Sequence, residues 1–327
     1  MTKLLLVSMP KSDGVKCLTD ITTSEGKLDR FSKICETIAQ AKGLDSNRVS
    51  KLIEEKTGLT NLKVIGRHLH ILSILGLIQR ETGKFNVTSR GKALSRATQK
   101  QNSSLERVLF FRSFFGEIPN QLFLVLEVVG RNESKGIEKN TFDYFQLPKD
   151  LNPCSKPFEE PAFGNEVPLL PSNYLKQNML NKFETMVCWL SQLNLVKKGN
   201  SALWLTDKGQ KLFDMVRTDG LSVLSANVYN YASRVYGSNT QEFDFKEDRG
   251  EFVRILREAS FYFKGQQNIS DLIAAQEYVS AFYATKGFSI GEKKFFGYVQ
   301  ELELDGSIRS VILGRDGKPM FFIMAEG

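Results

Sequence analysis

Two stretches of this chain, residues 72–94 and 190–212, carry the same residue pattern at a constant offset of 118 positions. Leu72-Ser73-Ile74-Leu75-Gly76-Leu77-Ile78 corresponds to Leu190-Ser191-Gln192-Leu193-Asn194-Leu195-Val196. Further on, Thr88-Ser89-Arg90-Gly91 corresponds to Thr206-Asp207-Lys208-Gly209. A repeat that keeps its spacing without a gap indicates that one supersecondary unit occurs at least twice.

Each copy begins at the end of an amphipathic helix, because apolar residues recur at steps of three and four before it. Gly76 and Asn194 stand where a residue of positive φ ends a helix, since Gly has no Cβ and Asn tolerates that conformation. Two short strands around a polar turn follow, at 77–80 and 85–87 in one copy and at 195–198 and 203–205 in the other. Thr88 and Thr206 are then predicted to cap closing helices over 89–97 and 207–216.

The front half of such a unit is visible upstream of the first copy. Apolar periodicity predicts helices over 28–41, 46–56 and 62–75, and Gly58-Leu59-Thr60-Asn61 forms a turn between the second and the third. This is helix-turn-helix topology. Together with the hairpin and the closing helix it predicts a winged helix. The expected fold class is mainly α with small β-hairpins (α+β), in tandem winged-helix modules.

A chain of 327 residues favours two or three modules over a single core. We expect an N-terminal lead-in over 1–26, a first winged helix over 27–98, a second over 105–217, a linker over 218–249 and a degenerate third winged helix over 250–327. The second is interrupted by an insertion loop over 148–173, which holds six of the nine prolines. A turn over 130–138 and a short helix over 139–147 precede that loop.

The third copy is predicted from helices over 252–263 and 269–285, a helix capped by Ser289, and a hairpin of strands 308–313 and 320–324. It lacks the closing Thr-x-x-Gly signature of the other two copies.

The balance of charges favours a polyanionic partner. Lys and Arg outnumber Asp and Glu by 44 to 37, which gives a net charge of +7 and a pI near 9.1. No apolar run approaches the roughly 18–20 residues of a membrane helix, so no membrane partner is expected. The four cysteines lack C-x-x-C spacing, which indicates neither a zinc site nor a disulfide framework. We therefore expect a cytoplasmic, nucleoid-associated protein whose main partner is double-stranded DNA.

In a winged helix the third helix enters the major groove and its exposed N-terminal residues read base edges. Cations of the wing and of its strands contact DNA phosphates. These contacts raise the affinity but do not distinguish one DNA sequence from another. The alternative is that these are only solvated helix faces, and for Glu292, Lys293 and Lys294 of the third copy we prefer that reading. The candidate base-reading residues are Asn61, Lys63, Arg67 and His70 in the first copy and Lys176, Gln177, Asn178, Asn181 and Lys182 in the second. The candidate phosphate contacts are Arg80, Lys84, Arg90, Lys197, Lys198 and Lys208.

The sequence offers no catalytic residues, no metal ligands and no cofactor site. It has no glycine-rich phosphate loop with the Lys-Ser/Thr ending. A metal-dependent nuclease needs an acidic residue followed by an acidic-x-Lys pair on a neighbouring strand. Asp244-Phe245-Lys246 and Glu133-Ser134-Lys135 match only the short half, in a polar turn and in a loop. We expect that the chain alone is not an enzyme.

Three winged helices in series, the second split by a long loop, resemble the DNA-recognition region of type IIS restriction endonucleases of the FokI kind. The passage Trp189-Leu190-Ser191-Gln192-Leu193-Asn194-Leu195-Val196-Lys197-Lys198-Gly199 with Thr206-Asp207-Lys208-Gly209 is similar to that family's W-L-x-x-L-G-L-V-K-x-G … T-x-x-G passage. Leu75-Gly76-Leu77-Ile78 with Thr88-Ser89-Arg90-Gly91 is similar to the equivalent passage of its first subdomain. The family also carries a metal-dependent nuclease domain, for which this sequence has no counterpart. The resemblance implies a recognition element served by a nuclease domain or subunit.

Three functions remain open on the sequence alone. The first is sequence-specific duplex DNA binding as the target-recognition element of a restriction-modification or defence system. The second is a transcription or plasmid-replication regulator built of the same winged helices. The third is a scaffold whose winged helices bind protein.

Overall fold

The computed structural model describes residues 26–41, 46–130, 137–138, 183–199, 202–237, 243–264, 269–313 and 319–324. Among them, helices predominate, and the strands form small antiparallel sheets of two or three strands. The prediction of a mainly helical α+β chain with hairpins is confirmed. The predicted lead-in before Gly26, the helix over 139–147 and the proline-rich loop over 148–173 lie outside these residues. So do five candidate base-reading residues: Lys176, Gln177, Asn178, Asn181 and Lys182.

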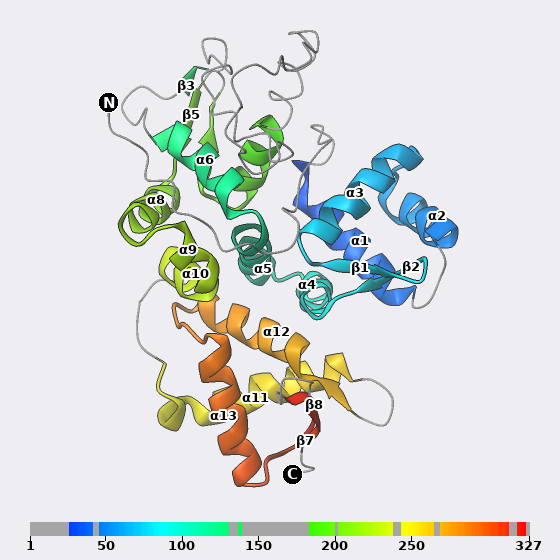
Figure 1. Cartoon of the computed structure of the whole chain (residues 1–327), viewed down its shortest axis with the longest axis vertical. Helices are drawn as coiled ribbons and strands as arrows, with labels where there is room; N and C mark the ends of the chain where they lie inside the picture. The colour runs from blue at the N-terminus through cyan, green and yellow to red at the C-terminus, as the bar shows by residue number, and fades with distance from the viewer. Residues whose placement is uncertain are drawn as a thin grey trace, which may run out of the picture.

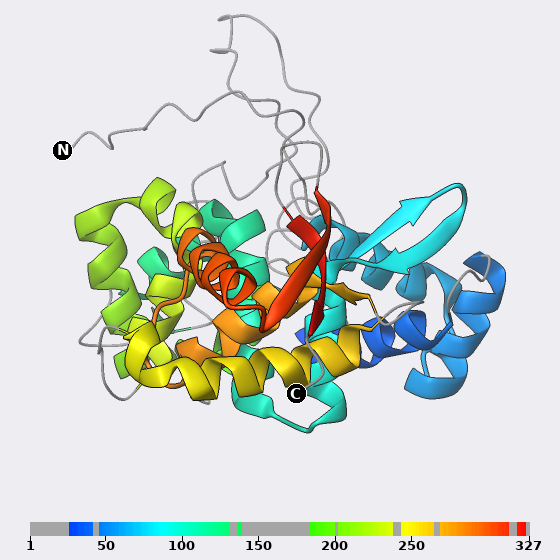
Figure 2. The same cartoon turned by 90° about the horizontal axis from the view of Figure 1, so that it is seen from below.

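The first unit consists of α1 (Leu28–Gln40), α2 (Ser46–Thr57), α3 (Leu62–Ile74), β1 (Ile78–Glu81), β2 (Lys84–Val87) and α4 (Ser89–Gln99). These bounds agree with the sequence prediction to within about two residues at each end. The three front helices enclose a core to which Phe31, Ile34, Ile53, Ile65 and Leu72 contribute fully buried side chains. The hairpin extends outward at the edge of the molecule (Figure 2).

The end of the third helix is built identically in both copies of the repeat. Gly76 has φ +65° and Asn194 has φ +58°, as predicted for residues that end a helix. In the first copy the backbone N–H of Leu77 donates to the carbonyl of Leu72 at 2.9 Å. In the second copy Leu195 donates to Leu190 at 2.8 Å. The repeat in the sequence is therefore a repeat of backbone hydrogen bonds.

The Thr-x-x-Gly signature closes each hairpin onto the following helix. Thr88 Oγ1 accepts from the backbone N–H of Gly91 at 3.1 Å and donates to the carbonyl of Gly76 at 2.7 Å. Thr206 accepts from Gly209 at 3.0 Å and donates to the carbonyl of Asn194 at 2.7 Å. Both predicted N-caps are thereby confirmed. Each Thr ties the start of the closing helix to the end of the preceding one.

The glycine of the signature is required because helix and strand approach closely. A Cβ on Gly91 would lie 2.0 Å from the carbonyl oxygen of Leu77, and a Cβ on Gly209 would lie 1.9 Å from that of Leu195. Both obstacles are backbone atoms, which cannot rotate away. The two positions therefore need glycine for space rather than for an unusual φ.

We expect Gly91→Ala to lower the free energy of unfolding by about 2 kcal/mol, because overpacking a fixed backbone contact costs about 1–3 kcal/mol. Urea denaturation measures this difference. Gly250→Ala is the matched control, since Gly250 is helical, exposed and has nothing within 4 Å of its missing Cβ. That control should gain about 0.5–1 kcal/mol from the better helix propensity of Ala. Equal effects of the two substitutions would contradict the steric account.

The second unit begins with α5 (Ser103–Glu117) and α6 (Pro119–Gly130). Its hairpin consists of β4 (Val196–Lys198) and β5 (Ala202–Leu205), which lie between the helical residues 183–192 and α8 (Asp207–Asp219). A short strand β3 (Ile137–Glu138) pairs antiparallel with β5 and makes the sheet three-stranded. The predicted turn over 130–138 is therefore wrong at its end, because Ile137 and Glu138 find backbone partners on β5.

The predicted linker over 218–249 is wrong for most of its length. It contains α9 (Leu221–Ala226) and α10 (Val228–Tyr236). Val228, Tyr231 and Val235 recur at steps of three and four and are buried, and α10 packs against α5, α8 and α12. The apolar residues of this stretch share one helical face, which the prediction of a linker overlooked.

The third unit consists of α11 (Phe245–Phe263), β6 (Ser270–Asp271), α12 (Leu272–Thr285), α13 (Glu292–Leu304), β7 (Ile308–Leu313) and β8 (Pro319–Met324). The two predicted strands form the expected hairpin, and β6 adds a third strand in the order β6-β8-β7. Two predictions need correction. The second helix starts at Leu272 rather than 269 because Asp271 Oδ1 caps it through the N–H of Ala274 at 2.9 Å. The cap residue of α13 is Gly291, without a side-chain bond, rather than Ser289.

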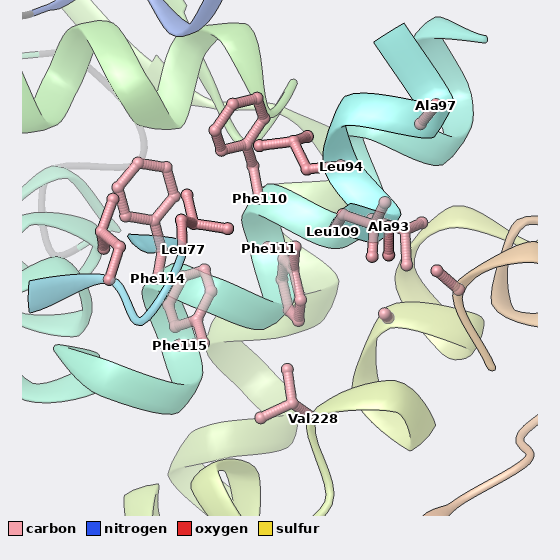
Figure 3. Close-up of a cluster of buried hydrophobic side chains, with 14 of the residues drawn as sticks. Leu77, Ala93, Leu94, Ala97, Leu109, Phe110, Phe111, Phe114, Phe115 and Val228 are labelled. Atoms are coloured by element: carbon pink, nitrogen blue, oxygen red, sulfur yellow. The ribbon is translucent and has the colours of Figure 1, made fainter. Parts of the chain in front are cut away.

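The three units meet at α5 and α12, which lie at the centre of the molecule (Figure 1). Phe110, Phe111, Phe114 and Phe115 of α5 are all buried, and Figure 3 shows Phe110 directed toward Leu94 of α4 and Phe111 toward Val228 of α10. The indole of Trp189 stacks on Phe114 with ring centres 4.9 Å apart and also lies against Phe31 of α1. These aromatic side chains therefore form part of the core that joins the units.

Candidate nucleic-acid interface

Helix α3 presents a polar face, and the start of the helix is capped by the residue that precedes it. The side-chain oxygen of Asn61 accepts from the N–H of Lys63 at 2.9 Å and caps the helix. Lys63, Arg67 and His70 follow at steps of four and three, opposite the buried side chains of Ile65 and Leu69. Lys63 and His70 are exposed and Arg67 is half-buried. Of the candidate base readers in this helix, Asn61 thus has a capping role that the sequence interpretation missed.

His68, the neighbour of this face, belongs to the core instead. It is fully buried, and its Nδ1 lies 2.8 Å from the carbonyl oxygen of Val64. Its ring contacts the edge of Phe31, with centres 5.6 Å apart. The imidazole of His70, two residues further along the helix, is the one that faces solvent.

Positive charge is concentrated around α3. Between Ser46 and Lys100 there are eleven Lys or Arg residues and three Asp or Glu residues. This excess of eight is larger than the net +7 of the whole chain, so the rest of the chain is slightly negative. Arg90, Lys92 and Lys100 pair with acids of other units, so the attraction of a polyanion to the first unit depends on its other cations.

The first hairpin adds two exposed cations. Arg80 lies opposite Phe85 and Lys84 lies opposite Glu81 in the antiparallel pairing. The guanidinium of Arg80 is 5.6 Å from the centre of the Phe85 ring, which holds it along the hairpin. Both cations are exposed, as a phosphate contact requires.

Arg90 is not available for a phosphate, and its assignment to the DNA contacts is wrong. Only 12% of its side chain is exposed. Its Nη1 lies 3.0 Å from Glu117 Oε1 and donates to the carbonyl of Leu75 at 3.2 Å, while its Nε lies 3.4 Å from Glu277 Oε1. Arg90 therefore joins α4 of the first unit to α5 and α12.

The partner Glu277 is itself buried and held from several sides. Tyr229 of α10 donates its hydroxyl to the Glu277 carboxylate, and Arg112 of α5 lies 3.9 Å from Glu277 Oε2. Burial, followed by the charge of Glu277, raises the pKa of Tyr229 well above its ordinary value, so this phenol remains a donor. Burial alone would lower the pKa of Arg90, but the carboxylates of Glu277 and Glu117 outweigh it and raise that pKa. This network of hydrogen bonds and ion pairs around Arg90 and Glu277, called the joint below, holds the units together.

Lys208 occupies the position of Arg90 in the second copy and also turns inward. Its Nζ lies 5.3 Å from the centre of the Tyr236 ring, and burial, followed by the charge of Arg107, lowers its pKa. The hydroxyl of Tyr236 donates at 2.9 Å to the carbonyl of Leu193, which corresponds to the Leu75 carbonyl bound by Arg90. In both repeats the cation that precedes the signature glycine, Arg90 or Lys208, therefore packs against a neighbouring helix. It does not point outward to where a DNA groove would lie.

The second hairpin keeps two of its predicted cations at the surface. Lys197 and Lys198 are both exposed on β4. Lys198 Nζ lies 2.7 Å from the Sγ of Cys188, while Lys197 faces Trp204 across the strand pair. These two cations remain candidates for phosphate contact.

Lys92 of α4 and Lys100, which follows the helix, bind acids of the third unit. Lys92 Nζ lies 2.6 Å from Asp271 Oδ2, Lys100 pairs with Glu258, and Ser89 donates to Asp271 at 3.1 Å. This contact between α4 and the third unit was not predicted from the sequence. A comparison of the two repeats could have indicated it, since Lys92 and Lys100 have no charged counterpart at Gln210 and Thr218.

The described residues hold no cluster of three or more His, Cys, Asp or Glu that could bind a metal ion. Asp244, from the first of the acidic-x-Lys sequences, caps α11 by accepting from the N–H of Lys246 at 2.8 Å. In the same part of the chain, none of the helices combines the length and the apolarity that crossing a membrane requires.

Comparison of the chain with protein-family models, with curated proteins and with solved structures finds no match. The functional conclusion therefore depends on the geometry and charge described above.

Proposed function

We propose that this protein binds duplex DNA sequence-specifically and acts as the target-recognition element of a restriction-modification or defence system. The observation that carries the proposal is the polar Lys63–Arg67–His70 face of α3, on which Lys63 and His70 are exposed, in a segment where Lys and Arg outnumber Asp and Glu by eleven to three. Arg and Lys suit the acceptors of guanine in the major groove. Arg80 and Lys84 on the hairpin supply phosphate contacts beside it.

The proposal takes the three units to be winged helices. The order helix, helix, helix, hairpin in residues 28–87 supports this assignment for the first unit. The third unit has the order α11, β6, α12, α13, β7, β8, in which the strand between the first two helices pairs with the hairpin. A third helix followed by a hairpin is the arrangement that places one helix in the major groove and a wing beside it.

A serial arrangement of such units supports the likeness to the recognition region of FokI-like type IIS restriction endonucleases. The joint around Arg90 and Glu277 holds the first and third units in one orientation. The units differ from one another and are held in a fixed orientation. Such an arrangement suits a monomer that recognises an asymmetric DNA site. A nuclease domain or subunit would then be the natural partner.

A regulator of transcription or plasmid replication is the second candidate, supported by the same helix face and wing. It would bind as a dimer to a palindromic operator, because protein two-fold symmetry is mirrored in the half-sites. Footprinting on selected duplexes separates the two: an asymmetric footprint favours target recognition and a palindromic one favours regulation.

Gel-shift titration of duplex DNA over a salt series tests DNA binding itself. With about six phosphate contacts, the affinity should fall by roughly 10³-fold between about 50 and 200 mM salt. The variant Lys84→Ala should reduce the salt slope by about one unit and weaken binding equally on all sequences. If duplex binding is absent at low salt, the protein is a scaffold and the proposal is wrong.

A further inference from the structure

The C-terminal half of α11 carries a row of exposed cations around an exposed aromatic ring. Arg254, Arg257 and Phe261 follow at steps of three and four on the side opposite the buried Phe252 and Leu256, and Lys264 ends the helix. Phe261 is 71% exposed, and its neighbour Tyr262 is 39% exposed. This row is called the α11 ridge below.

The first unit extends the α11 ridge with two more cations. Arg96 of α4 lies over the ring of Tyr262, next to Phe261, and Lys100 pairs with Glu258. Burial, followed by the charges of Arg96 and Arg254, lowers the pKa of Lys100, so these cations are close enough to repel one another. Two carboxylates offset part of the charge, since Glu258 pairs with Lys100 and Glu251 lies 3.4 Å from Arg254.

Arg257 and Lys264 are exposed and take part in no ion pair within the described part of the chain. Like charges gathered on a folded surface raise its energy unless an anion approaches it. The distance from Arg254 to Lys264 along a helix is about 15 Å, at about 1.5 Å per residue. That length covers about four base pairs of a DNA strand, at about 3.4 Å each.

We propose that the α11 ridge is a second DNA-contact surface, which grips the phosphate backbone of a duplex through Arg254, Arg257 and Lys264 while Phe261 packs against the sugars. The inference deepens the proposed function and depends on it. The ridge belongs to the third unit and adds phosphate contact from α11 rather than from its third helix, α13. The α11 ridge would raise the affinity for every DNA sequence and would not discriminate between sequences.

The salt dependence of duplex binding tests the α11 ridge. The full-length triple variant Arg254→Ala, Arg257→Ala, Lys264→Ala should lower the salt slope by about two to three units, at about 0.9 per phosphate contact. The loss should be equal on a selected duplex and on a scrambled one. Phe261→Ala should weaken both equally, and Phe261→Tyr should retain binding because the ring remains.

The matched control removes three exposed cations elsewhere: Lys211→Ala, Lys246→Ala, Lys293→Ala. It should leave the salt slope unchanged, and thermal unfolding of both triple variants should match that of the wild type. Wild-type binding with an unaltered slope in the ridge variant would overturn this inference alone and would point to an acidic protein partner. Absence of duplex binding by the wild type would overturn the proposed function and this inference together.

Discussion

Replacing Arg90 with Met should lower the free energy of unfolding by about 3–5 kcal/mol, because it removes the nearest cation from the buried Glu277 carboxylate and from Glu117. Arg90 contacts Glu117, Glu277 and the Leu75 carbonyl, and its side chain is only 12% exposed. Removing it leaves Glu277 with Tyr229 and Arg112 as partners. The three units would then lose their common joint.

Urea denaturation measures the effect of Arg90→Met, and Arg80→Met is its matched control. Arg80 is an exposed cation of the same unit, so its loss should change stability by about 0.5 kcal/mol or less. Arg90→Lys should restore only part of the loss, since an ammonium cannot reach three acceptors in a planar fork. Equal stability of the Arg90→Met and Arg80→Met variants would contradict the account of the joint.

The double variant Lys63→Ala, Arg67→Ala should weaken binding to the selected duplex by roughly 10²–10⁴-fold. Each side chain that reads a base by hydrogen bonds contributes about 1–3 kcal/mol of discrimination. Binding to a scrambled duplex should fall far less, because phosphate contacts from the hairpin remain. The ratio of the two affinities, measured at one salt concentration, is the decisive quantity.

The control for this pair is Lys211→Ala, Lys246→Ala, two exposed lysines outside α3 and the hairpin. It removes the same charge and should leave the ratio of specific to scrambled affinity unchanged. A loss in the Lys63 and Arg67 variant that is equal on both duplexes would mean that α3 contacts only phosphates. Base reading by this helix would then be wrong.

The local elements could be predicted because their signals lie within a few residues. Gly76 and Asn194, Thr88 and Thr206, and the apolar spacing of the helices each determine their own backbone geometry. The hairpins followed from turns between short apolar runs. These predictions did not require knowledge of the tertiary contacts.

The direction of individual side chains could not be predicted in the same way. Arg90 and Lys208 have the sequence context of surface cations, yet Glu277 and Tyr236, from distant segments, determine where they lie. The burial of α9 and α10 could not be predicted in this way either, because it depends on α5 and α12, which the sequence does not place beside them. On α3, by contrast, Lys63 and His70 remain exposed, since they lie opposite the buried side chains of Ile65 and Leu69.

Selection of bound duplexes from a random pool by the full chain tests the central claim most directly. Successive rounds should enrich one short motif, and alanine at Lys63 and Arg67 should abolish the enrichment while weak binding persists. A pool that stays random in composition, although the protein is folded and retains duplexes at low salt, would contradict sequence-specific recognition.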